Sequence, residues 1–558
     1  MNRLLNIIED LDKKPVSAYS RLYGTYYDEN ISYYIGNVTG TKIKYCTIDI
    51  SIPVERLLGD LPYSPFIEIP LCYYSLCNFA VAAHMINAET AQSETKTAKG
   101  YFVPPNFTEV VSRRSICTVN HGHIIFSISV RLPYTADTTS KSKTGHISSH
   151  ALKLLLYKNM PMLVRRFAAD FDLCALKNAI ELYNDQQFIR QYLADHGYVS
   201  FVGNGSVLPK RLRGERFRQR IIPFSSPKGM EISIQLPSGK KVTGMGIQRG
   251  ITIIIGDAYH GKSTLISAIA GGVLNRCASC GRGYVITDES ALSIRAEEGR
   301  NVQNTDISFY VTDPSDMMFD PKQFTSVKAS GSTSQAAAVY EGMEAKCRLM
   351  LFDEDKSANN FMYKDAAMKR IIKNASTRPF IDSIRKLYEQ TGTSSILVVG
   401  STAEYFAVAD RVILLDRYLA YEYKDYEKKN IADDFQFMMK HERRLGLSRL
   451  RNALQEKGMA VTREGFLVIG GETVPVKECI PDCTQEQMAF IGAFMHRLAN
   501  DTNDGKSIGK ALRGMYSVFS CNITSLSITT HQGFSNIEFV READMRCIIN
   551  RMRLIDLK

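Results

Sequence analysis

The chain has 558 residues, of which 44% are hydrophobic and 23% are charged, and its formal net charge is +11. This length exceeds what one hydrophobic core supports, so we expect two to four domains of ordinary globular composition. Twelve cysteines at irregular spacings and the acidic-containing start MNRLLNIIEDLDKK argue against a secreted, disulfide-rich protein. They favour a protein with reduced thiols in the cytoplasm, with an organellar matrix as the alternative.

The first 200 residues alternate between strand-like and helical patterns and predict an N-terminal α+β domain. Residues 31–52 are typical of a hairpin with a glycine-containing turn, and residues 123–132 of another strand. The apolar stretch 71–86 predicts a buried helix that is too short to span a bilayer, so no membrane insertion is expected. A polar loop is expected at about 134–150, followed by helices.

The segment after these helices is strongly basic. Its cations are Lys210, Arg211, Arg213, Arg216, Arg218 and Arg220. One interpretation is a solvated linker between domains, and the other is a groove that neutralises nucleic-acid phosphates, beside which Phe201, Phe217 and Phe224 could stack on unpaired bases. A second basic helix is expected at 441–451. The net charge agrees with a polyanionic partner but equally with an ordinary basic protein.

From residue 201 to about 428, strands alternate with helices in the rhythm of a largely parallel sheet. Residues 429–558 begin with a charged helical run and then predict a small mixed unit. The expected fold class is α/β. A core with a mixed, mainly parallel sheet (201–428) is flanked by the N-terminal α+β domain (1–200) and a small C-terminal α/β domain (429–558).

Residues 256–263 carry the complete pattern G-x-x-x-x-G-K-[ST] of the phosphate-binding P-loop. Glycines let the backbone turn so that successive N–H groups point at phosphate oxygens. The strand ITIII precedes the loop, and a helix whose positive N-terminus faces the anion follows it. Lys262 is expected to reach the β- and γ-phosphates, and the Ser263 hydroxyl to ligate Mg²⁺. The predicted nucleotide contacts are Gly256, Asp257, Ala258, Tyr259, His260, Gly261, Lys262, Ser263 and Thr264.

Two further stretches narrow the class of nucleotide-binding protein. Residues 347–354 form an apolar strand that ends in Asp353 and Glu354, where one carboxylate can hold the Mg²⁺ shell and the next can polarise the attacking water. About twenty residues earlier, a Ser-Gly turn at 330–331 leads directly into a helix and presents backbone amides to an anion. Taken alone, that turn is equally well a capped helix.

A P-loop, then a Ser-Gly helix start with glutamine, then a strand ending Asp-Glu resembles the ABC class of ATPases in order and spacing. The stretches YHGKSTL, IRAEEGR, ASGSTSQAA, DEDKSANNFM, RPFIDSIRKLY and SSILVVGSTAEYFAVADRVILLD together are similar to the predicted ABC-class ATPase family. That family occurs in bacteria and some protists and includes a kinetoplastid mitochondrial RNA-binding member. The similarity is strongest over about 200–425 and looser at both ends.

The resemblance implies a P-loop NTPase core of the ABC ATPase type that binds ATP and Mg²⁺ and forms a homodimer. Lys262 and Glu354 are the implied catalytic residues, with Glu354 as general base, and Ser263 and Asp353 the implied metal ligands. The implied signature that acts on the other protomer's γ-phosphate comprises Ser330, Gly331, Ser332 and Gln335. Residues 355–359 become the loop through which the paired sites communicate.

Two departures from the family pattern bear on activity. Gly400-Ser401-Thr402 stands where most ABC ATPases carry a histidine, which predicts slow turnover. Asp257 and Ala258 replace the glycines that usually follow Gly256, and a carboxylate beside phosphate is repulsive unless it points away. Gln303 is only a candidate for the glutamine that contacts Mg²⁺.

The isolated pair Cys277 and Cys280 lacks a second pair at zinc-site spacing, so no structural zinc is expected. The function expected is an ATP-binding and ATP-hydrolysing homodimer that binds RNA or another nucleic acid. The alternative is an ATP-dependent binding module or switch with negligible turnover. A small-molecule kinase or a transport subunit fits less well, because the former needs no Ser-Gly signature and the latter needs a spanning domain.

Overall fold

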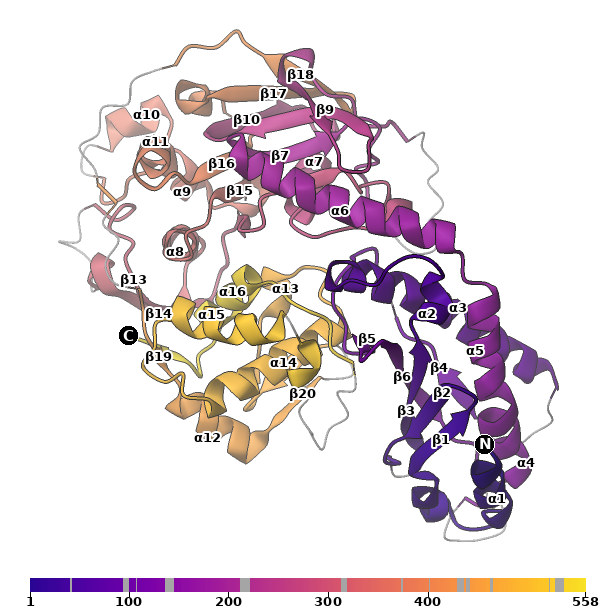
Figure 1. Ribbon diagram of the computed structural model, residues 1–558. Helices are drawn as coiled ribbons and strands as arrows, with labels where there is room; N and C mark the ends of the chain where they lie inside the picture. The colour runs from indigo at the N-terminus through magenta and orange to yellow at the C-terminus, as the bar shows by residue number, and fades with distance from the viewer. Residues whose placement is uncertain are drawn as a thin grey trace. The chain divides into compact units, whose positions relative to one another are not determined.

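The computed structural model describes residues 1–40, 43–93, 100–106, 108–135, 145–210, 221–312, 319–372, 375–400, 402–428, 436–437, 442–461, 465–520, 522–526 and 536–558. The chain forms two compact units (Figure 1). Unit 1 comprises Met1–Glu181 and Ser527–Phe539, and unit 2 comprises Leu182–Leu526 and Val540–Lys558. The division into three domains stays a prediction, and most of the expected C-terminal domain falls within unit 2.

Unit 1 is built on an antiparallel sheet in the order β1–β2–β3–β6–β4, with β5 also paired to β6. Its strands are β1 (Gly24–Asp28), β2 (Ile31–Ile35), β3 (Tyr45–Pro53), β4 (Tyr101–Val103), β5 (Cys117–Asn120) and β6 (His123–Arg131). Every second side chain of β3 and β6 is buried, because successive side chains point to opposite faces of a sheet. The predicted hairpin at 31–52 and the predicted strand at 123–132 are confirmed.

Helices cover the buried face of this sheet. They are α1 (Asn2–Asp10), α2 (Glu55–Leu58), α3 (Glu68–Ser93), α4 (Ser149–Leu152) and α5 (Met160–Ala169). Phe79 of α3 stacks on Phe126 of β6 with ring centroids 4.3 Å apart, and both rings contact Phe167 of α5. The predicted apolar helix is therefore a core helix of unit 1.

The predicted length of that helix is wrong. It was expected at 71–86 but extends over Glu68–Ser93, because Glu68, Ile69 and Pro70 form its first turn and the mostly polar residues 87–93 continue the helix. Among the described residues, Pro65–Ala91 is the one helical stretch long and apolar enough to cross a membrane, with mean hydropathy 1.4, and 61% of its apolar window is buried inside the protein. The helix is thus long enough to span a bilayer, contrary to the expectation from residues 71–86, and more than half of its apolar window is buried.

A segment near the C-terminus completes unit 1. The backbone N–H of Ser115 donates to the carbonyl oxygen of Ile537 at 2.9 Å, and that of Phe539 donates to Arg113 at 3.0 Å. Between them, the carboxylate of Glu538 lies 3.0 Å from the guanidinium of Arg114, and both side chains are almost completely buried. A buried ion pair and backbone hydrogen bonds therefore hold residues 537–539 within unit 1.

Unit 2 is centred on a six-stranded sheet in the order β12–β15–β16–β10–β17–β18. The strands are β10 (Ile251–Gly256), β12 (Leu292–Ile294), β15 (Leu349–Asp353), β16 (Ser394–Val398), β17 (Arg411–Asp416) and β18 (Leu419–Tyr423). Five of them run parallel, and β18 pairs antiparallel with β17. The predicted mixed, mainly parallel sheet of an α/β core is confirmed.

The two faces of this sheet bury alternate residues of each strand. On one face, Ile254, Leu351 and Val398 pack with α7 (Lys262–Gly271) and with strands of a second sheet. On the other face, Ile253 and Phe352 pack with α8 (Gly331–Glu344), α9 (Asn359–Met362) and α11 (Phe380–Thr391). A strand covered on both sides reads as a continuous apolar run, which is why ITIII and LMLF carry no polar alternation.

The second sheet of unit 2 is antiparallel, in the order β11–β7–β9–β8. Its strands are β7 (Tyr198–Gly203), β8 (Glu231–Gln235), β9 (Lys241–Gln248) and β11 (Val285–Thr287). The long helix α6 (Leu173–Asp195) begins in unit 1 and ends in unit 2. The hairpin β13 (Arg300–Thr305) and β14 (Phe324–Ala329) leads directly into α8, and α10 (Ala366–Ile371) precedes α11.

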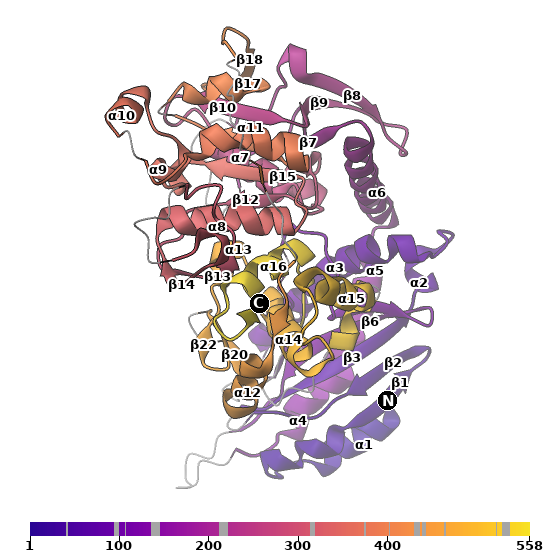
Figure 2. The same cartoon turned by 90° about the vertical axis from the view of Figure 1, so that its left-hand side faces the viewer.

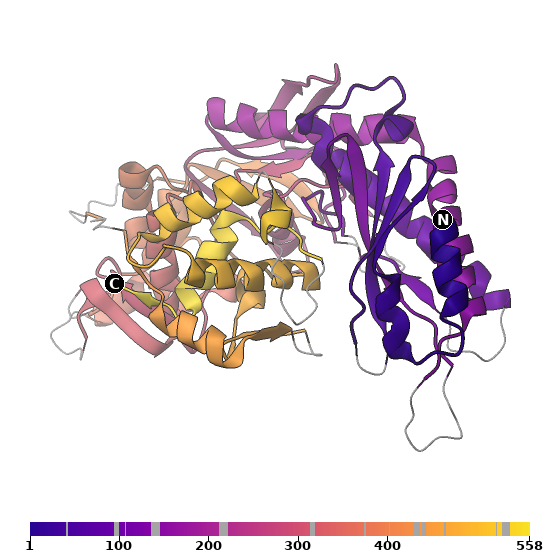
Figure 3. The ribbon, with the colours of Figure 1, turned by 60° about the horizontal axis from the view of Figure 1, so that its bottom comes forward.

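The C-terminal part of unit 2 gathers helices around small sheets (Figures 1 and 3). The helices are α12 (Ser448–Lys457), α13 (Val476–Cys479), α14 (Gln485–Asn500), α15 (Ile508–Phe519) and α16 (Glu542–Arg551). The strands β20 (Met459–Val461), β21 (Leu467–Ile469) and β22 (Glu472–Thr473) form one sheet, and β19 (Leu445–Gly446) pairs with β23 (Asp556–Leu557). Figure 2 shows α16 close to α8, with the six-stranded sheet that contains β10 on the other side of α8.

Candidate nucleotide site

The P-loop connects the end of β10 to the start of α7. Gly256 has φ +149 and Gly261 has φ +98, conformations that glycine adopts without steric cost. A Cβ on Gly256 would lie 2.3 Å from the carbonyl oxygen of Leu415, so the adjacent strand also requires glycine there. Tyr259 has φ +64, and its side chain is 92% exposed. Three positive-φ residues turn the backbone tightly between strand and helix, as a phosphate cradle requires.

The ammonium group of Lys262 folds back over this loop. It donates hydrogen bonds to the carbonyl oxygens of Gly256 at 2.7 Å and of Asp257 at 3.0 Å. The Asp257 carboxylate accepts a hydrogen bond from the N–H of Ala258 at 2.7 Å. A phosphate in the loop would compete with this carboxylate for the same N–H, which is the physical reason to expect modest affinity.

The other predicted loop residues lie at the start of α7. Ser263 and Thr264 occupy its first turn, where backbone N–H groups have no partner within the helix. The Ser263 side chain is exposed, and that of Thr264 is half-buried. Both hydroxyls therefore lie at the positive end of a helix that begins at the loop.

The carboxylates of Asp353 and Glu354 lie at the same edge of the sheet as the loop. Asp353 is the last residue of β15 and pairs in register with Val398 of β16. Val398 pairs on its other side with Ile254 of β10, two residues before the P-loop. Because the carboxyl ends of parallel strands meet at one edge, the predicted metal ligand and the loop are brought together.

Asp353 is suited to hold a divalent cation. Its side chain is 9% exposed, and Oδ2 lies 3.3 Å from Nζ of Lys356. Its buried Oδ1 accepts no hydrogen bond from any described residue. A buried carboxylate oxygen without a partner costs free energy unless a ligand satisfies it, and Mg²⁺ prefers such oxygen donors. The residues at this edge fit a bound Mg²⁺ ion.

Gly400 brings Lys262 and Glu354 together. Its N–H donates a short hydrogen bond to the Glu354 carboxylate. A Cβ built on Gly400 would lie 3.6 Å from Oε2 of Glu354 and 3.7 Å from Nζ of Lys262. The sequence indicated this position only as the place of a missing histidine. Burial, reinforced by the nearby charge of Glu354, raises the pKa of Tyr405 well above its ordinary value.

The turn between β17 and β18 packs on the P-loop, a contact that sequence reasoning missed. Arg417 and Tyr418 have φ +47 and +70, both left-handed. The N–H of Tyr418 donates to the carbonyl oxygen of His260 at 3.3 Å. A Cβ on Gly261 would lie 3.0 Å from the Tyr418 ring. A two-residue link between apolar strands predicts the hairpin, but nothing local predicts its contact with the loop.

The predicted signature lies at the start of α8. Ser330 is the exposed N-cap residue, and its hydroxyl accepts a hydrogen bond from the N–H of Thr333 at 3.4 Å. The N–H of Gly331 donates to Oε2 of Glu298 at 2.8 Å. A Cβ on Gly331 would contact the Cβ atoms of Ala296 and Ala358 at 3.5 and 3.8 Å. The helix therefore begins beside the residues that follow β12 and β15.

Gln335 and Ser332 make hydrogen bonds within the protein, and their nucleotide contact stays a prediction. Gln335 is fully buried, and its amide donates to Ser357 Oγ at 3.0 Å and accepts from the N–H of Ala358 at 2.9 Å. The Ser332 hydroxyl donates to Asn360 at 2.6 Å. These side chains instead connect α8 to the loop that follows Glu354, because one helical turn carries them inward from the exposed tip.

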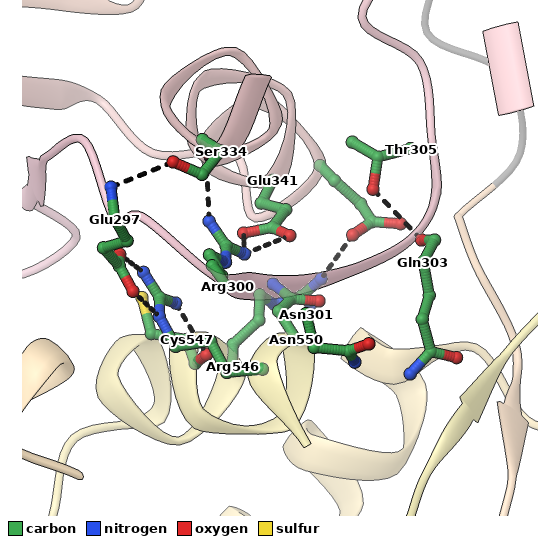
Figure 4. A network of polar contacts seen from close by, with 12 residues as sticks. Glu297, Arg300, Asn301, Gln303, Thr305, Ser334, Glu341, Arg546, Cys547 and Asn550 are labelled. Carbon is green, nitrogen blue, oxygen red and sulfur yellow. Dashed lines mark hydrogen bonds and ion pairs between the residues drawn. The ribbon is translucent and has the colours of Figure 1, made fainter. Parts of the chain in front are cut away.

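Buried ion pairs hold α8 and the neighbouring segment 297–300. Residues 297–305 pass between α8 and α16, as Figure 4 shows. The pairs are Arg300 with Glu341, Arg443 with Glu344, and Arg551 with Glu297, and all six side chains are at most 10% exposed. Burial opposes ionisation of Glu297, but Arg551 outweighs it and holds the pKa of Glu297 below its ordinary value.

Gln303 is not the glutamine that contacts Mg²⁺. Its amide donates to the carbonyl oxygens of Met552 at 3.1 Å and Ile555 at 2.8 Å, and accepts from the N–H of Leu557 at 3.1 Å. Gln303 thus binds the C-terminal strand of the chain. The position of a glutamine in the sequence does not reveal its hydrogen-bond partners, which for Gln303 lie 249 to 254 residues further along the chain.

Most of the predicted nucleic-acid segment lies outside the described residues, namely Arg211, Arg213, Arg216, Arg218 and Arg220. Lys210 is described, and its Nζ lies 2.6 Å from Oδ2 of Asp482. Phe201 and Phe224 are buried at 0% and 4% exposure in the core, so their predicted base stacking is wrong, and Phe217 is outside the described residues.

The second basic helix was also placed wrongly. It was expected at 441–451, but α12 begins at Ser448, and Arg443 is buried against Glu344 at 2.7 Å. A charged run of this kind is predicted to be solvated. The sequence does not show that Arg443 in this run pairs with the carboxylate of Glu344 on α8. Neither Cys277 nor Cys280 forms a disulfide bond in the described part of the chain; the Cys277 thiol lies 3.2 Å from the Ser279 hydroxyl, and the Cys280 thiol donates to the carbonyl oxygen of Cys277 at 3.1 Å.

Comparison with known proteins agrees with this geometry. The family model of the ABC ATPase P-loop domain matches residues 172–453. An uncharacterized protein of Methanocaldococcus jannaschii, MJ1628, is 30% identical over 276 residues, which is 48% of this chain and 60% of that protein. The match thus spans about three-fifths of the relative's length.

Among solved structures, the ADP-bound MJ1267, an ATP-binding cassette of an ABC transporter, is 11% identical. The similarity covers 40% of this chain and 89% of that one with a TM-score of 0.24, too low to establish a shared topology. The family match covers both strand ends, the P-loop and the signature helix described above. The chain belongs to the ABC ATPase family of P-loop domains.

Proposed function

We propose that this protein binds ATP with Mg²⁺ at the edge formed by Lys262, Asp353 and Glu354, and hydrolyses it as a homodimer. The observation that carries the proposal is the convergence of Lys262 and Glu354 on Gly400, beside the unpartnered Oδ1 of Asp353. An ammonium group, a metal-binding carboxylate and a second carboxylate at one strand edge are the groups that phosphoryl transfer to water needs.

Each residue has a distinct part in nucleotide binding. The P-loop amides and Lys262 would hold the phosphates, with Lys262 exchanging its hydrogen bonds to Gly256 and Asp257 for phosphate oxygens. Ser263 and Asp353 would hold Mg²⁺, which supplies charge neutralisation at the transferring phosphoryl group. The Tyr259 ring is exposed at the P-loop, and the Tyr418 ring lies against Gly261 in the same loop.

Glu354 would accept the proton of the attacking water. In this conformation its carboxylate accepts a hydrogen bond from the Gly400 N–H, and the Lys262 ammonium group lies near the same glycine. Most ABC ATPases carry a histidine at this position. The uncharged backbone N–H of Gly400 cannot make the contact of a charged side chain, so turnover is expected to be slow. If the Gly400 contact persists with ATP bound, the protein acts as a nucleotide-dependent switch with negligible turnover, which is the second candidate function.

A second copy would complete the site. The signature tip at Ser330 lies beside the ends of β12 and β15, and β12 is three strand positions from β10. At a strand spacing of about 4.8 Å, this separates Ser330 from its own P-loop by roughly 14 Å along the edge. Both motifs open at the same edge, so a twofold-related copy can place its Ser330 over this protomer's γ-phosphate. That arrangement supports an ATP-dependent homodimer.

We also propose that the partner is RNA or another nucleic acid and that the protein acts in the cytoplasm. The support is the net charge of +11 and the basic segment that begins at Lys210. Filter binding of the full chain to single-stranded RNA, single-stranded DNA and duplex DNA at low salt tests the partner. Absence of binding to all three would remove this part of the proposal and leave the ATPase intact.

Hydrolysis is tested by phosphate release from Mg²⁺–ATP by the full chain. The wild type should release phosphate slowly, and Glu354→Gln should be about 10²- to 10³-fold slower while still binding ATP. Equal rates in the two proteins would contradict the role of Glu354. Binding of ATP by both without any phosphate release would favour the switch.

A further inference from the structure

Residues 297–300 form a tight turn that presents one carboxylate at the start of α8. The N–H of Arg300 donates to the carbonyl oxygen of Glu297 at 3.4 Å, and Gly299 has φ +78, as glycine allows at the third position of a turn. Glu298 is the second residue of this turn, and its side chain is exposed. The turn therefore projects the Glu298 side chain outward.

The backbone of the turn is anchored on every side. The N–H of Glu297 donates to Ser334 Oγ at 2.9 Å, and that of Gly299 donates to the carbonyl oxygen of Ala329 at 2.9 Å. The Glu297 carboxylate is paired with Arg551, and the neighbouring Arg300 with Glu341 (Figure 4). The exposed side chain of Glu298 is thus the part of this turn that can move without breaking a buried contact.

That side chain occupies the tip of the signature helix. Its Oε2 accepts a hydrogen bond from the N–H of Gly331 at 2.8 Å. Gly331 is the first residue of α8, where unpaired N–H groups and the helix dipole favour an anion. The Glu298 carboxylate therefore already accepts the hydrogen bond from the Gly331 N–H that a γ-phosphate bound to a second copy would need.

We propose that Glu298 is a built-in competitor for the γ-phosphate at the signature helix, so that closure of the dimer requires its displacement. The inference rests on the proposed ATP-dependent homodimer. One N–H cannot serve two anions, and a carboxylate left within a few ångströms of a triphosphate is repelled by it. Glu298 must rotate into solvent as Ser330 and Gly331 engage the partner's nucleotide. It weakens closure whenever a γ-phosphate is absent or poorly placed.

The test measures dimerisation of the full chain by sedimentation velocity with Mg²⁺ and a non-hydrolysable ATP analogue. Glu298→Gln keeps the shape of the side chain and removes its charge, and Glu298→Ala removes the contact altogether. Both should dimerise more tightly than wild type, by about 5- to 30-fold, because two helix tips change in each dimer. Glu456→Gln, an exposed glutamate of α12, makes the same change in net charge and should leave the dimerisation constant at the wild-type value.

The possible outcomes separate this inference from the proposed function. If wild type dimerises with nucleotide and both Glu298 variants dimerise equally or more weakly, the competitor role is overturned and the homodimer stands. If Glu456→Gln tightens the dimer as much as Glu298→Gln, net charge is the cause and the role is again overturned. If no variant dimerises with nucleotide, the homodimer itself fails, and the inference fails with it.

Discussion

The two halves of the proposed ATP site are built in opposite ways. In the P-loop half, residues 256–264 are exposed or half-buried, and among the described residues the Lys262 ammonium group donates to the backbone carbonyl oxygens of Gly256 and Asp257. The signature half is one helix, α8, whose residues from Ser334 to Glu344 are all buried. Two buried ion pairs, Arg443 with Glu344 and Arg551 with Glu297, tie α8 and the turn before β13 to the C-terminal part of unit 2, and a third, Arg300 with Glu341, joins β13 to α8.

On the proposed function, the P-loop half binds the nucleotide, and the signature half transmits its presence to the C-terminal part of unit 2. Exposed groups at the P-loop can change partners at little cost when phosphate arrives. The signature helix is tied to the loop after Glu354 through Gln335, and to α16 through the Arg546 guanidinium, which lies 3.9 Å from the Glu344 carboxylate. A nucleotide that engages Ser330 would therefore act on the C-terminal part through contacts that are already formed.

A substitution at Lys262 is the strongest test of the contrast between the two halves. Lys262→Ala should lower ATP turnover by about 10³-fold, because it removes the cation that we propose to hold the β- and γ-phosphates. The free energy of unfolding should change by less than about 1 kcal/mol, since Lys262 is a half-buried residue at the start of α7 whose ammonium group donates to two backbone carbonyl oxygens. Phosphate release and urea unfolding measure the two effects. A large loss of stability with normal turnover would reverse the roles assigned to the two halves.

The signature half should respond in the opposite sense. Glu344→Gln should lower the free energy of unfolding by about 3 kcal/mol, because Arg443 then remains buried beside a neutral partner. Glu389→Gln is the matched control, since Glu389 is half exposed and lies 3.5 Å from the Lys386 ammonium group. Its effect should stay within about 0.5 kcal/mol. Equal effects in urea unfolding would mean that burial of the Arg443 pair contributes nothing special.

The pH dependence of stability sharpens the same contrast. The pKa of Glu297 is held below its ordinary value of 4.5, so its pair with Arg551 stabilises the folded state fully above that value. The contribution is lost as the pH falls through the depressed pKa. Glu297→Gln should therefore be less stable than wild type by about 2 kcal/mol at pH 7, with the gap closing in acid. A gap that stays constant down to about pH 3 would assign the effect to packing.

The smallest effect is expected at Gln335. Gln335→Leu should cost about 1 to 2 kcal/mol of stability, because Ser357 and the Ala358 N–H lose their partner. ATP affinity of the monomer should change by less than about twofold, while turnover falls because the loop after Glu354 loosens. Isothermal titration with ATP checks the affinity. A tenfold loss of monomer affinity would mean that Gln335 also supports the P-loop half of the site, contrary to the division between the two halves.

The sequence predicted the elements of this site better than their contacts. The strand ITIII, the glycines of the P-loop and the strand ending in Asp353 are local patterns, and each determines its own geometry. The paired strands also follow, since parallel strands must meet at one edge. The cap at Ser330 is likewise local, because a serine before a helix accepts its first N–H groups.

The contacts that were missed all join distant parts of the chain. Gly400 touches Lys262 and Glu354, Gln303 binds the C-terminal strand, and Arg551 pairs with Glu297 across 254 residues. Nothing in the neighbourhood of any of these residues specifies the partner, because the side chain is chosen by a surface that forms only after folding. A single sequence shows which residues are charged, but not which charges are buried together.

The most direct test of the central claim, that two copies complete each other's sites, is the mass of the Glu354→Gln chain in solution with and without Mg²⁺–ATP. The account predicts a 62.7 kDa monomer without nucleotide and a dimer with it. Adding Ser330→Arg should leave ATP binding intact and abolish the dimer. A Ser330→Arg protein that still dimerises with ATP would contradict the account.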